Sequence, residues 1–229
     1  MKHVDGDVYV CNQTCFIDWV FLNMNYSPLF TKIVVIKKAP GQKEEIGLKV
    51  LGPIETILSA FGIVFPEVHK TAPPGTFFSI KKLKEESGLL CYKGYRPVVI
   101  FPEGTKTNGL GILNIDEGLV EMIGNAAGLE ENLRVHAIRF DHKFQYFSPY
   151  NTTDRLGLWS VIGIIQQFAS TYIVQYYFNL EGPLHEECKT TQEKSDLIKH
   201  ALMIRRKEQM MKHSDWRMHQ EFLDFWNKT

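Results

Sequence analysis

The chain has 229 residues, of which 44% are hydrophobic and 23% charged, so it can bury a core of its own. Its 26 Lys and Arg residues balance 26 Asp and Glu residues, and the formal net charge is zero. Proteins that bind nucleic acid through its phosphates normally carry a basic excess, so we expect no nucleic-acid partner. The cysteines lack CxxC spacing, and we expect reduced thiols in a cytosol-facing protein, with no metal site: Cys11, Cys15, Cys91 and Cys188.

Short apolar runs of strand length alternate with segments of helical length along the chain. The predicted strands cover residues 8–12, 32–36, 62–65, 97–101, 133–140 and 171–180. The predicted helices cover residues 18–25, 53–61, 77–87, 116–127, 158–168, 192–211 and 215–227. This alternation predicts the α/β class, as a layered domain with a largely parallel sheet.

The last two predicted helices form an extension, residues 191–229, packed on a domain of residues 1–190. Four large apolar side chains recur near helical spacing in the final helix, and we expect them to dock on the sheet: Trp216, Phe222, Leu223 and Trp226.

The longest uncharged stretch, residues 156–180, changes character at its middle. Its first half is typical of a helix, whereas residues 171–178 are β-branched and aromatic, as in strands. A membrane-spanning helix needs about 20 predominantly apolar residues. We therefore expect a helix followed by a buried strand, and no transmembrane segment.

Ligands of open α/β sheets gather beyond the carboxyl ends of the strands, and two such segments are rich in polar groups. Residues 12–19 follow the first predicted strand, and residues 101–109 follow the fourth. The second segment combines a carboxylate, a glycine, hydroxyls and an ammonium group, which suits a phosphate ester. The same residue types are typical of turns, so composition alone leaves a binding site and a plain turn equally open.

Residues 101–109, which read FPEGTKTNG, are similar to the FPEGT block, which is the third block, of the glycerophospholipid acyltransferase superfamily, the PlsC-like enzymes. Residues 12–18 resemble the family's first block, which is Asn-His followed by four residues and Asp. The resemblance covers most of residues 5–185. It implies an acceptor-binding site formed by Phe101, Pro102, Glu103, Gly104, Thr105, Lys106 and Asn108.

PlsC-like enzymes transfer a fatty acyl group from acyl-CoA to a hydroxyl of a glycerol phosphate or lysophospholipid. The resemblance implies a layered α/β/α fold with a mainly parallel sheet and some mixed strands. It also implies acyl-CoA as co-substrate without a bound cofactor, and a lysophospholipid, namely lysophosphatidate, as acceptor. Because these lipids are amphiphiles, it implies a membrane surface as partner, on the cytosolic face of the endoplasmic reticulum or of a lipid droplet.

The family's catalytic His is replaced here by Gln13. In the family, this His is the general base and the Asp five residues later orients it, so the catalytic positions map to Gln13 and Asp18. A glutamine amide can align a hydroxyl or a phosphate oxygen, but it does not titrate near neutral pH. Asp18 could equally be a helix N-cap. Of the other histidines, we expect His69, just beyond a predicted strand, to be the best placed to substitute.

The second and fourth family blocks are altered as well. The acceptor-binding Arg of the second block is replaced by Val68, and the proline-centred fourth block corresponds to residues 135–138. Two interpretations follow. A fungal lysophosphatidate acyltransferase branch of lipid droplets also lacks the His and has Asn-x-Thr in the first block, like residues 12–14 here. Alternatively, the chain is a catalytically inactive pseudoenzyme that binds lipid or acts as a scaffold at a membrane.

Two segments are candidates for membrane contact. Residues 46–65 are apolar with few charges, and the lysines Lys37, Lys38, Lys81, Lys82 and Lys84 could meet anionic headgroups. The pattern of residues 46–65 is equally typical of an ordinary buried helix, and the lysines are equally typical of a solvated helix face.

Overall fold

The computed structural model describes residues 7–38, 42–62, 65–88, 96–107, 111–127, 133–143, 171–177, 180, 184, 187–202, 209–210 and 214–226. In these residues the strands are β1 (Val8–Cys11), β2 (Leu29–Ile36), β3 (Glu45–Val50), β4 (Glu67–His69), β5 (Thr76–Phe77), β6 (Val98–Ile100), β7 (Gly111–Ile112), β8 (Val135–Lys143), β9 (Thr171–Tyr177) and β10 (Gln209–Met210). The helices are α1 (Phe16–Tyr26), α2 (Pro53–Phe61), α3 (Ile80–Gly88), α4 (Glu117–Ala126), α6 (Thr191–Leu202) and α7 (Trp216–Trp226). The predicted helix at residues 158–168 lies outside the described residues, as does Asn108.

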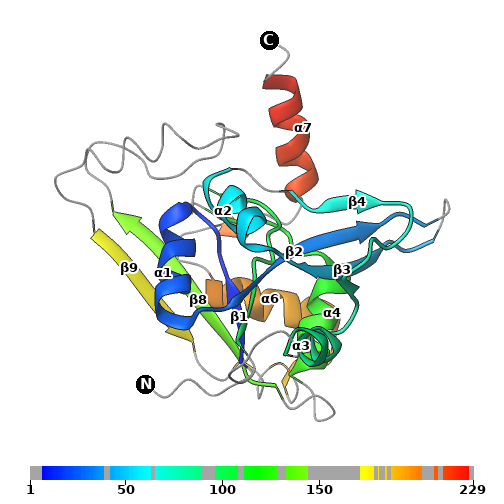
Figure 1. The fold of residues 1–229 in the computed structure, drawn as a ribbon, viewed down its shortest axis with the longest axis horizontal. Helices are drawn as coiled ribbons and strands as arrows, with labels where there is room; N and C mark the ends of the chain where they lie inside the picture. The colour runs from blue at the N-terminus through cyan, green and yellow to red at the C-terminus, as the bar shows by residue number, and fades with distance from the viewer. Residues whose placement is uncertain are drawn as a thin grey trace.

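An eight-stranded mixed sheet forms the centre of the molecule (Figure 1). Its strand order is β5-β3-β2-β6-β1-β8-β9, and β4 pairs with β2 beside this path. The strands from β2 to β8 in this order are parallel, whereas β3, β5 and β9 join antiparallel at the two sides. The α/β class and the largely parallel centre of the sheet are thus confirmed.

The sheet is covered on both faces, which makes three layers. Along β1, Val8 and Val10 face one hydrophobic core, whereas Tyr9 and Cys11 face the other. The first core is closed by α3, α4, α6 and the start of α7, and the second by α1 and α2. Burial on both faces explains the continuous apolar run of β1, which is typical of a central parallel strand.

One predicted strand, residues 62–65, is wrong in the part that the structure describes. Gly62 donates its N–H to Leu58 O and ends α2, and Phe65 precedes the proline Pro66 without joining a strand. The strand forms only at β4, since proline has no N–H for a ladder. The sequence reading also missed β3, whose Ile46 and Leu48 are buried rather than exposed to a membrane.

The C-terminal segment is not helical throughout. Residues 209–210, predicted within a helix, form β10 and pair in parallel with β7. The helix α7 then extends away from the sheet (Figure 1), held at its start by the buried Trp216. Arg217 adds ion pairs with Asp215 and Glu44. Of the predicted docking stripe, Leu223 is also buried, whereas Phe222 is exposed.

Among the helices that the structure describes, none combines the length and apolar character needed to cross a bilayer.

Candidate functional site

The two resembling blocks meet at one edge of the sheet. β1 and β6 are parallel neighbours, so the segments that follow them leave the sheet at the same end. A backbone hydrogen bond from Thr107 N to Gln13 O, 3.0 Å long, ties the two segments together. The topology therefore brings together residues that lie about ninety positions apart in the chain.

Asn12 fixes where the first block leaves the sheet. Its side chain donates to Phe140 O (3.0 Å) and accepts from Phe140 N (2.8 Å). Because Phe140 belongs to β8, these two buried bonds extend the β1–β8 pairing past the end of the ladder. The amide of Asn12 thus has a structural role and positions the next residue, Gln13.

Asp18 acts as the capping carboxylate of α1. It occupies the third position of the helix, and its Oδ2 accepts from Thr14 N (2.7 Å), Thr14 Oγ1 (2.8 Å) and Cys15 N (3.0 Å). Its Oδ1 accepts from Tyr172 Oη (3.2 Å). These bonds satisfy orphan donors at the helix N-terminus, which is the helix-capping interpretation of Asp18. They shape the loop that presents Gln13.

Gln13 lines a small cavity of about 20 Å³ together with residues of both blocks and the neighbouring strands. The side chain is 3% exposed, and its Nε2 has no hydrogen-bond partner. The cavity walls are formed by Gln13, Trp19, Thr31, Lys32, Ile33, Leu51, Pro66, Phe101 and Gly104. Its volume is about that of one water molecule or one ligand oxygen.

Gly104 allows the third block to form this wall. Its φ of 68° is in the left-handed region, and a Cβ there would lie 2.9 Å from Pro66 Cγ. Only glycine meets both conditions without strain. Before it, Phe101 stacks on Phe30 and lies tilted against Trp19, and Pro102 is buried.

The side chain of Glu103 is buried, and its pKa is unusually high. Burial raises its pKa from 4.5 to about 8, although the Leu113 N–H donates to its Oε2 at 3.1 Å. Its Oε1 has no partner. At neutral pH this side chain is therefore largely a neutral carboxylic acid, able to donate one hydrogen bond as well as to accept.

Lys106 is also buried, and its ammonium group points inward. Its Nζ donates to Ala60 O at 2.6 Å, and burial lowers its pKa to about 8. Ala60 lies in the last turn of α2, where the carbonyls lack intrahelical partners and favour a cation. Lys106 thus holds the end of α2 against the third block, and its Nζ is not exposed for a headgroup.

A histidine without a sequence motif contacts the third block from the C-terminal helix. His219 Nδ1 lies 3.1 Å from Oγ1 of the buried Thr105, and its ring packs edge-on against Phe65 at 5.4 Å. Trp216, His219 and Leu223 lie on the same face of α7, with Trp216 and Leu223 buried. The helical spacing of these residues indicated a buried face, but it did not predict which part of the protein this face contacts.

The histidine favoured from the sequence lies elsewhere. His69, on β4, contacts Glu67 Oε2 through Nε2 at 3.2 Å and does not line the cavity. His136 is buried against Asp7 at 3.4 Å. In the first block, burial and the nearby Asp18 raise the pKa of the Cys15 thiol well above its usual range, which agrees with a structural thiol.

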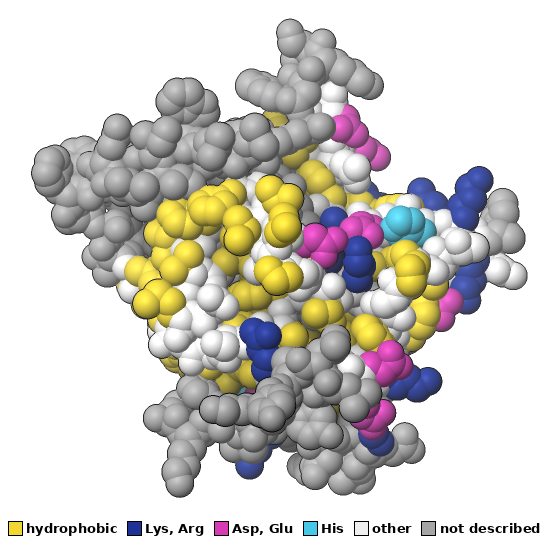
Figure 2. All heavy atoms as spheres, viewed as in Figure 1, with side chains coloured by type: hydrophobic (Ala, Val, Ile, Leu, Met, Phe, Trp, Pro, Cys, Tyr) yellow, Lys and Arg dark blue, Asp and Glu magenta, His cyan; other side chains and the backbone are white. Residues whose placement is uncertain are grey.

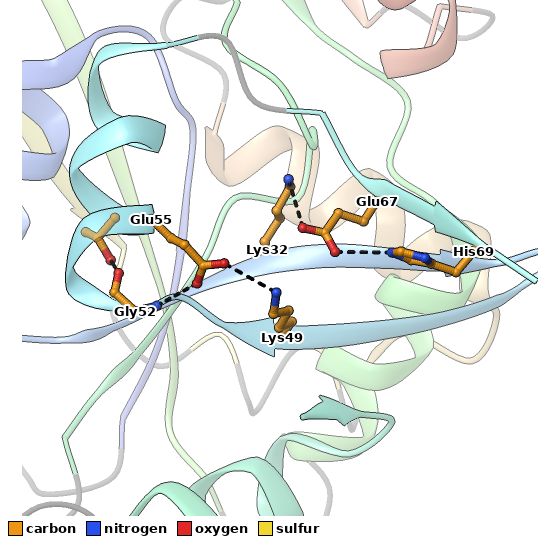
Figure 3. A network of polar contacts seen from close by, with 7 residues as sticks. Lys32, Lys49, Gly52, Glu55, Glu67 and His69 are labelled. Atoms are coloured by element: carbon orange, nitrogen blue, oxygen red, sulfur yellow. Dashed lines mark hydrogen bonds and ion pairs between the residues drawn. The ribbon is translucent and has the colours of Figure 1, made fainter. Parts of the chain in front are cut away.

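Two lysines of the neighbouring strands each lie beside a carboxylate (Figure 3). Lys32 on β2 contacts Glu67 Oε1 at 3.2 Å, and His69 contacts the other oxygen of Glu67. Lys49 on β3 contacts Glu55 Oε1 at 3.4 Å, while Glu55 Oε2 accepts from the N-cap of α2. Of the two lysines, Lys32 lines the cavity.

An apolar groove of about 410 Å³ runs between α1 and α2 beside the cavity, and the two share Trp19 and Leu51. Arg96 also lines the groove. Around it the helices expose large apolar side chains, which Figure 2 shows as a yellow surface: Val20, Met24, Ile54, Ile57 and Leu58. Exposed apolar patches of this kind mark interaction surfaces. We call these five residues the α1–α2 patch.

The lysines of the predicted basic cluster at residues 81–84 differ in their exposure to solvent. Lys81 and Lys82 are exposed, but Lys84 is buried, and its Nζ has no hydrogen-bond partner. Burial lowers the Lys84 pKa to about 8. The remaining pair, Lys37 and Lys38, is exposed at the end of β2.

Comparisons with protein-family models, with curated proteins and with solved structures found no match for this chain. Among the described residues, no group of three or more His, Cys, Asp or Glu side chains could hold a metal ion.

Proposed function

We propose that the protein is an acyl-CoA-dependent acyltransferase of the PlsC-like type, with the lysophospholipid lysophosphatidate as acceptor. The observation that carries the proposal is the shared cavity of Gln13 and Gly104. These residues come from the two separate blocks that resemble the family, and the fold places them on one wall.

His219 supplies the titratable group that position 13 lacks. In the proposed step, the acceptor hydroxyl oxygen attacks the thioester carbonyl carbon while its proton passes to the imidazole of His219. The carbon–sulfur bond then breaks, and the CoA thiolate leaves and takes the proton back. The products are the ester and free CoA thiol. Thr105, bonded to Nδ1, orients the ring, which is the usual role of a third group beside a base.

The α1–α2 patch is the surface through which the protein would meet a membrane. Helices that lie on a bilayer present apolar side chains to the acyl region, and the patch adjoins the groove that continues from the cavity. A lipid acceptor could therefore keep its chain near the bilayer while its headgroup reaches the site. Localisation at the endoplasmic reticulum or a lipid droplet belongs to the same proposal.

The test is product formation by the purified protein from labelled acyl-CoA and lysophosphatidate in mixed vesicles. Glu103→Ala should abolish the product because it empties a buried position of the third block. Glu86→Ala, an exposed carboxylate on α3, is the matched control and should leave the rate unchanged. Product no greater than that of Glu103→Ala would reject the enzyme.

A lipid-binding pseudoenzyme is the second candidate, because Gln13 cannot take a proton and Asp18 is committed to capping α1. It predicts lysophosphatidate binding without product in the wild type. In that case Gln13→His, which restores the family's residue beside Asp18, would show whether the remaining groups still support turnover.

A further inference from the structure

We propose that the ion pairs of Arg217 form an electrostatic latch, which holds α7 against the sheet and its covering helices and releases it as the ionic strength rises. The sheet stays folded when α7 is released. Docking of α7 brings His219 to Thr105, so the latch sets the fraction of molecules in which this contact exists. Control of turnover through this contact rests on the proposed function, whereas docking itself does not.

The helix α7 has a small buried face. Figure 1 shows it extending away from the sheet, with its start beside the other elements. Of the α7 residues whose exposure the structure describes, Trp216 and Leu223 are buried, whereas Met218, Phe222 and Phe225 are exposed. Segments with few buried apolar side chains open at a lower free-energy cost than the core does. α7 can therefore open while the sheet remains intact.

The chain is fixed just before α7, which confines the movement to the helix. β10 pairs with β7, and Asn114 N donates to Ser214 O at 2.8 Å. Asp215 follows and caps the helix, because its Oδ1 accepts from Arg217 N at 3.0 Å. When α7 is released, the bonds before it remain, and the helix turns about Asp215.

Arg217 joins α7 to two other elements. Its Nη2 contacts Glu44 Oε2, just before β3, and lies 3.7 Å from Oδ2 of Asp116, the N-cap of α4. Its Nη1 contacts Asp215 Oδ2 at 2.9 Å, and its guanidinium lies 4.6 Å from the ring centre of Trp216. Because Arg217 belongs to α7 and the carboxylates of Glu44 and Asp116 do not, these two pairs act across the boundary that opens.

Salt can reach these ion pairs. The side chains of Arg217, Glu44 and Asp116 are 36%, 35% and 23% exposed, and they line a surface cavity of about 260 Å³. The Debye length falls from about 10 Å at 0.1 M salt to about 3 Å at 1 M, so salt weakens exposed ion pairs and leaves buried apolar contacts in place. The ion pairs are therefore the part of the α7 contact that ionic strength controls.

Hydrogen exchange, followed by mass spectrometry on the full chain, compares the peptides of α7 with those of β1 and β6. Between about 0.05 M and about 0.5 M KCl, α7 should exchange roughly fivefold faster, and the strands should not change. Arg217→Met should speed α7 exchange roughly tenfold at low salt and remove most of the salt response. Lys43→Met is the matched control, because Lys43 lines the same cavity but pairs with Glu117 and Glu121. It should change α7 exchange less than about twofold.

Glu44→Gln tests the pair that crosses the boundary. Alone it should speed α7 exchange, but it should add little to Arg217→Met, because the two residues act as one pair. Equal effects of Arg217→Met and Lys43→Met, or a wild-type α7 that does not respond to salt, would overturn the inference. The same holds if Arg217→Met speeds the exchange of the strands as much as that of α7, since the helix would then not open separately.

The latch and the proposed function can fail separately. A salt-responsive α7 in a protein without acyl transfer would reject only the acyltransferase. Acyl transfer by a protein whose α7 responds neither to salt nor to Arg217→Met would reject only the latch.

Discussion

The imidazole of His219 and the hydroxyl of Thr105 lie 3.1 Å apart, although 114 positions separate them in the chain. If His219 is the base, His219→Gln should lower kcat by roughly 10²–10⁴-fold with little change in KM, because an amide can keep the contact with Thr105 but cannot accept a proton. Steady-state kinetics with lysophosphatidate and acyl-CoA measure this.

Imidazole added to His219→Ala provides the check against a merely structural role. Rescue by imidazole is expected if the lost group is a base, whereas damaged packing would not respond. His200→Gln changes an exposed histidine on α6 and should behave as the wild type. Full activity in His219→Gln would exclude His219 as the base.

Gly104 and Gly75 form a natural pair for testing the backbone of the third block. Both have positive φ, 68° and 79°, but a Cβ at Gly104 meets Pro66 at 2.9 Å, whereas one at Gly75 has nothing within 4 Å. Gly75→Ala should cost about 1–2 kcal/mol from backbone strain alone. Gly104→Ala should lose about 1–3 kcal/mol more from the overlap. Urea unfolding compares them, and equal losses would contradict the close approach of Pro66.

Glu103 should make folding stability depend on pH. Its pKa is raised in the folded protein from 4.5 to about 8, so the unfolded chain releases this proton at lower pH than the folded one. The contribution is present below pH 4.5 and is lost as the pH rises toward 8. Glu103→Gln removes this titration. The unfolding free energy of the variant should therefore exceed the wild type's increasingly between pH 5 and 8, as urea titrations at several pH values would show.

The α1–α2 patch should mediate vesicle binding. Ile54 and Leu58 are 75% and 66% exposed, so replacing both with Asp should reduce co-sedimentation with phospholipid vesicles without lowering the melting temperature. Phe225→Asp changes an equally exposed side chain on α7 and is the control. Loss of binding in the control alone would move the membrane contact to α7.

Local sequence signals predicted much of the fold. The α2 bounds were predicted correctly, because Gly52 and Pro53 start this helix and Gly62 ends it. The sequence indicated that each block follows a strand, but only the structure shows that these strands, β1 and β6, are parallel neighbours. The strand predicted at residues 62–65 is wrong at Gly62 and Phe65. The hydrophobic pattern does not take into account that Pro66, which follows, has no N–H for a strand ladder.

The chemistry of individual side chains was less predictable. Lys106 suited a phosphate by residue type, but only the packing of α2 shows that its ammonium group is held by Ala60 O. No sequence motif surrounds His219. Its contact with Thr105 depends on where α7 docks, and the docking of α7 depends on Trp216 and Arg217. The predicted domain boundary at residue 190 stays a prediction.

The place of α7 at the far end of the chain gives the site an order of assembly. Gln13 and Thr105 are synthesised early, and His219 follows Thr105 by 114 residues, which at the usual pace of translation is roughly 6–23 s. During this interval a nascent sheet can form while the imidazole is still missing. If His219 is the base of the proposed reaction, docking of α7 is the event that completes the site.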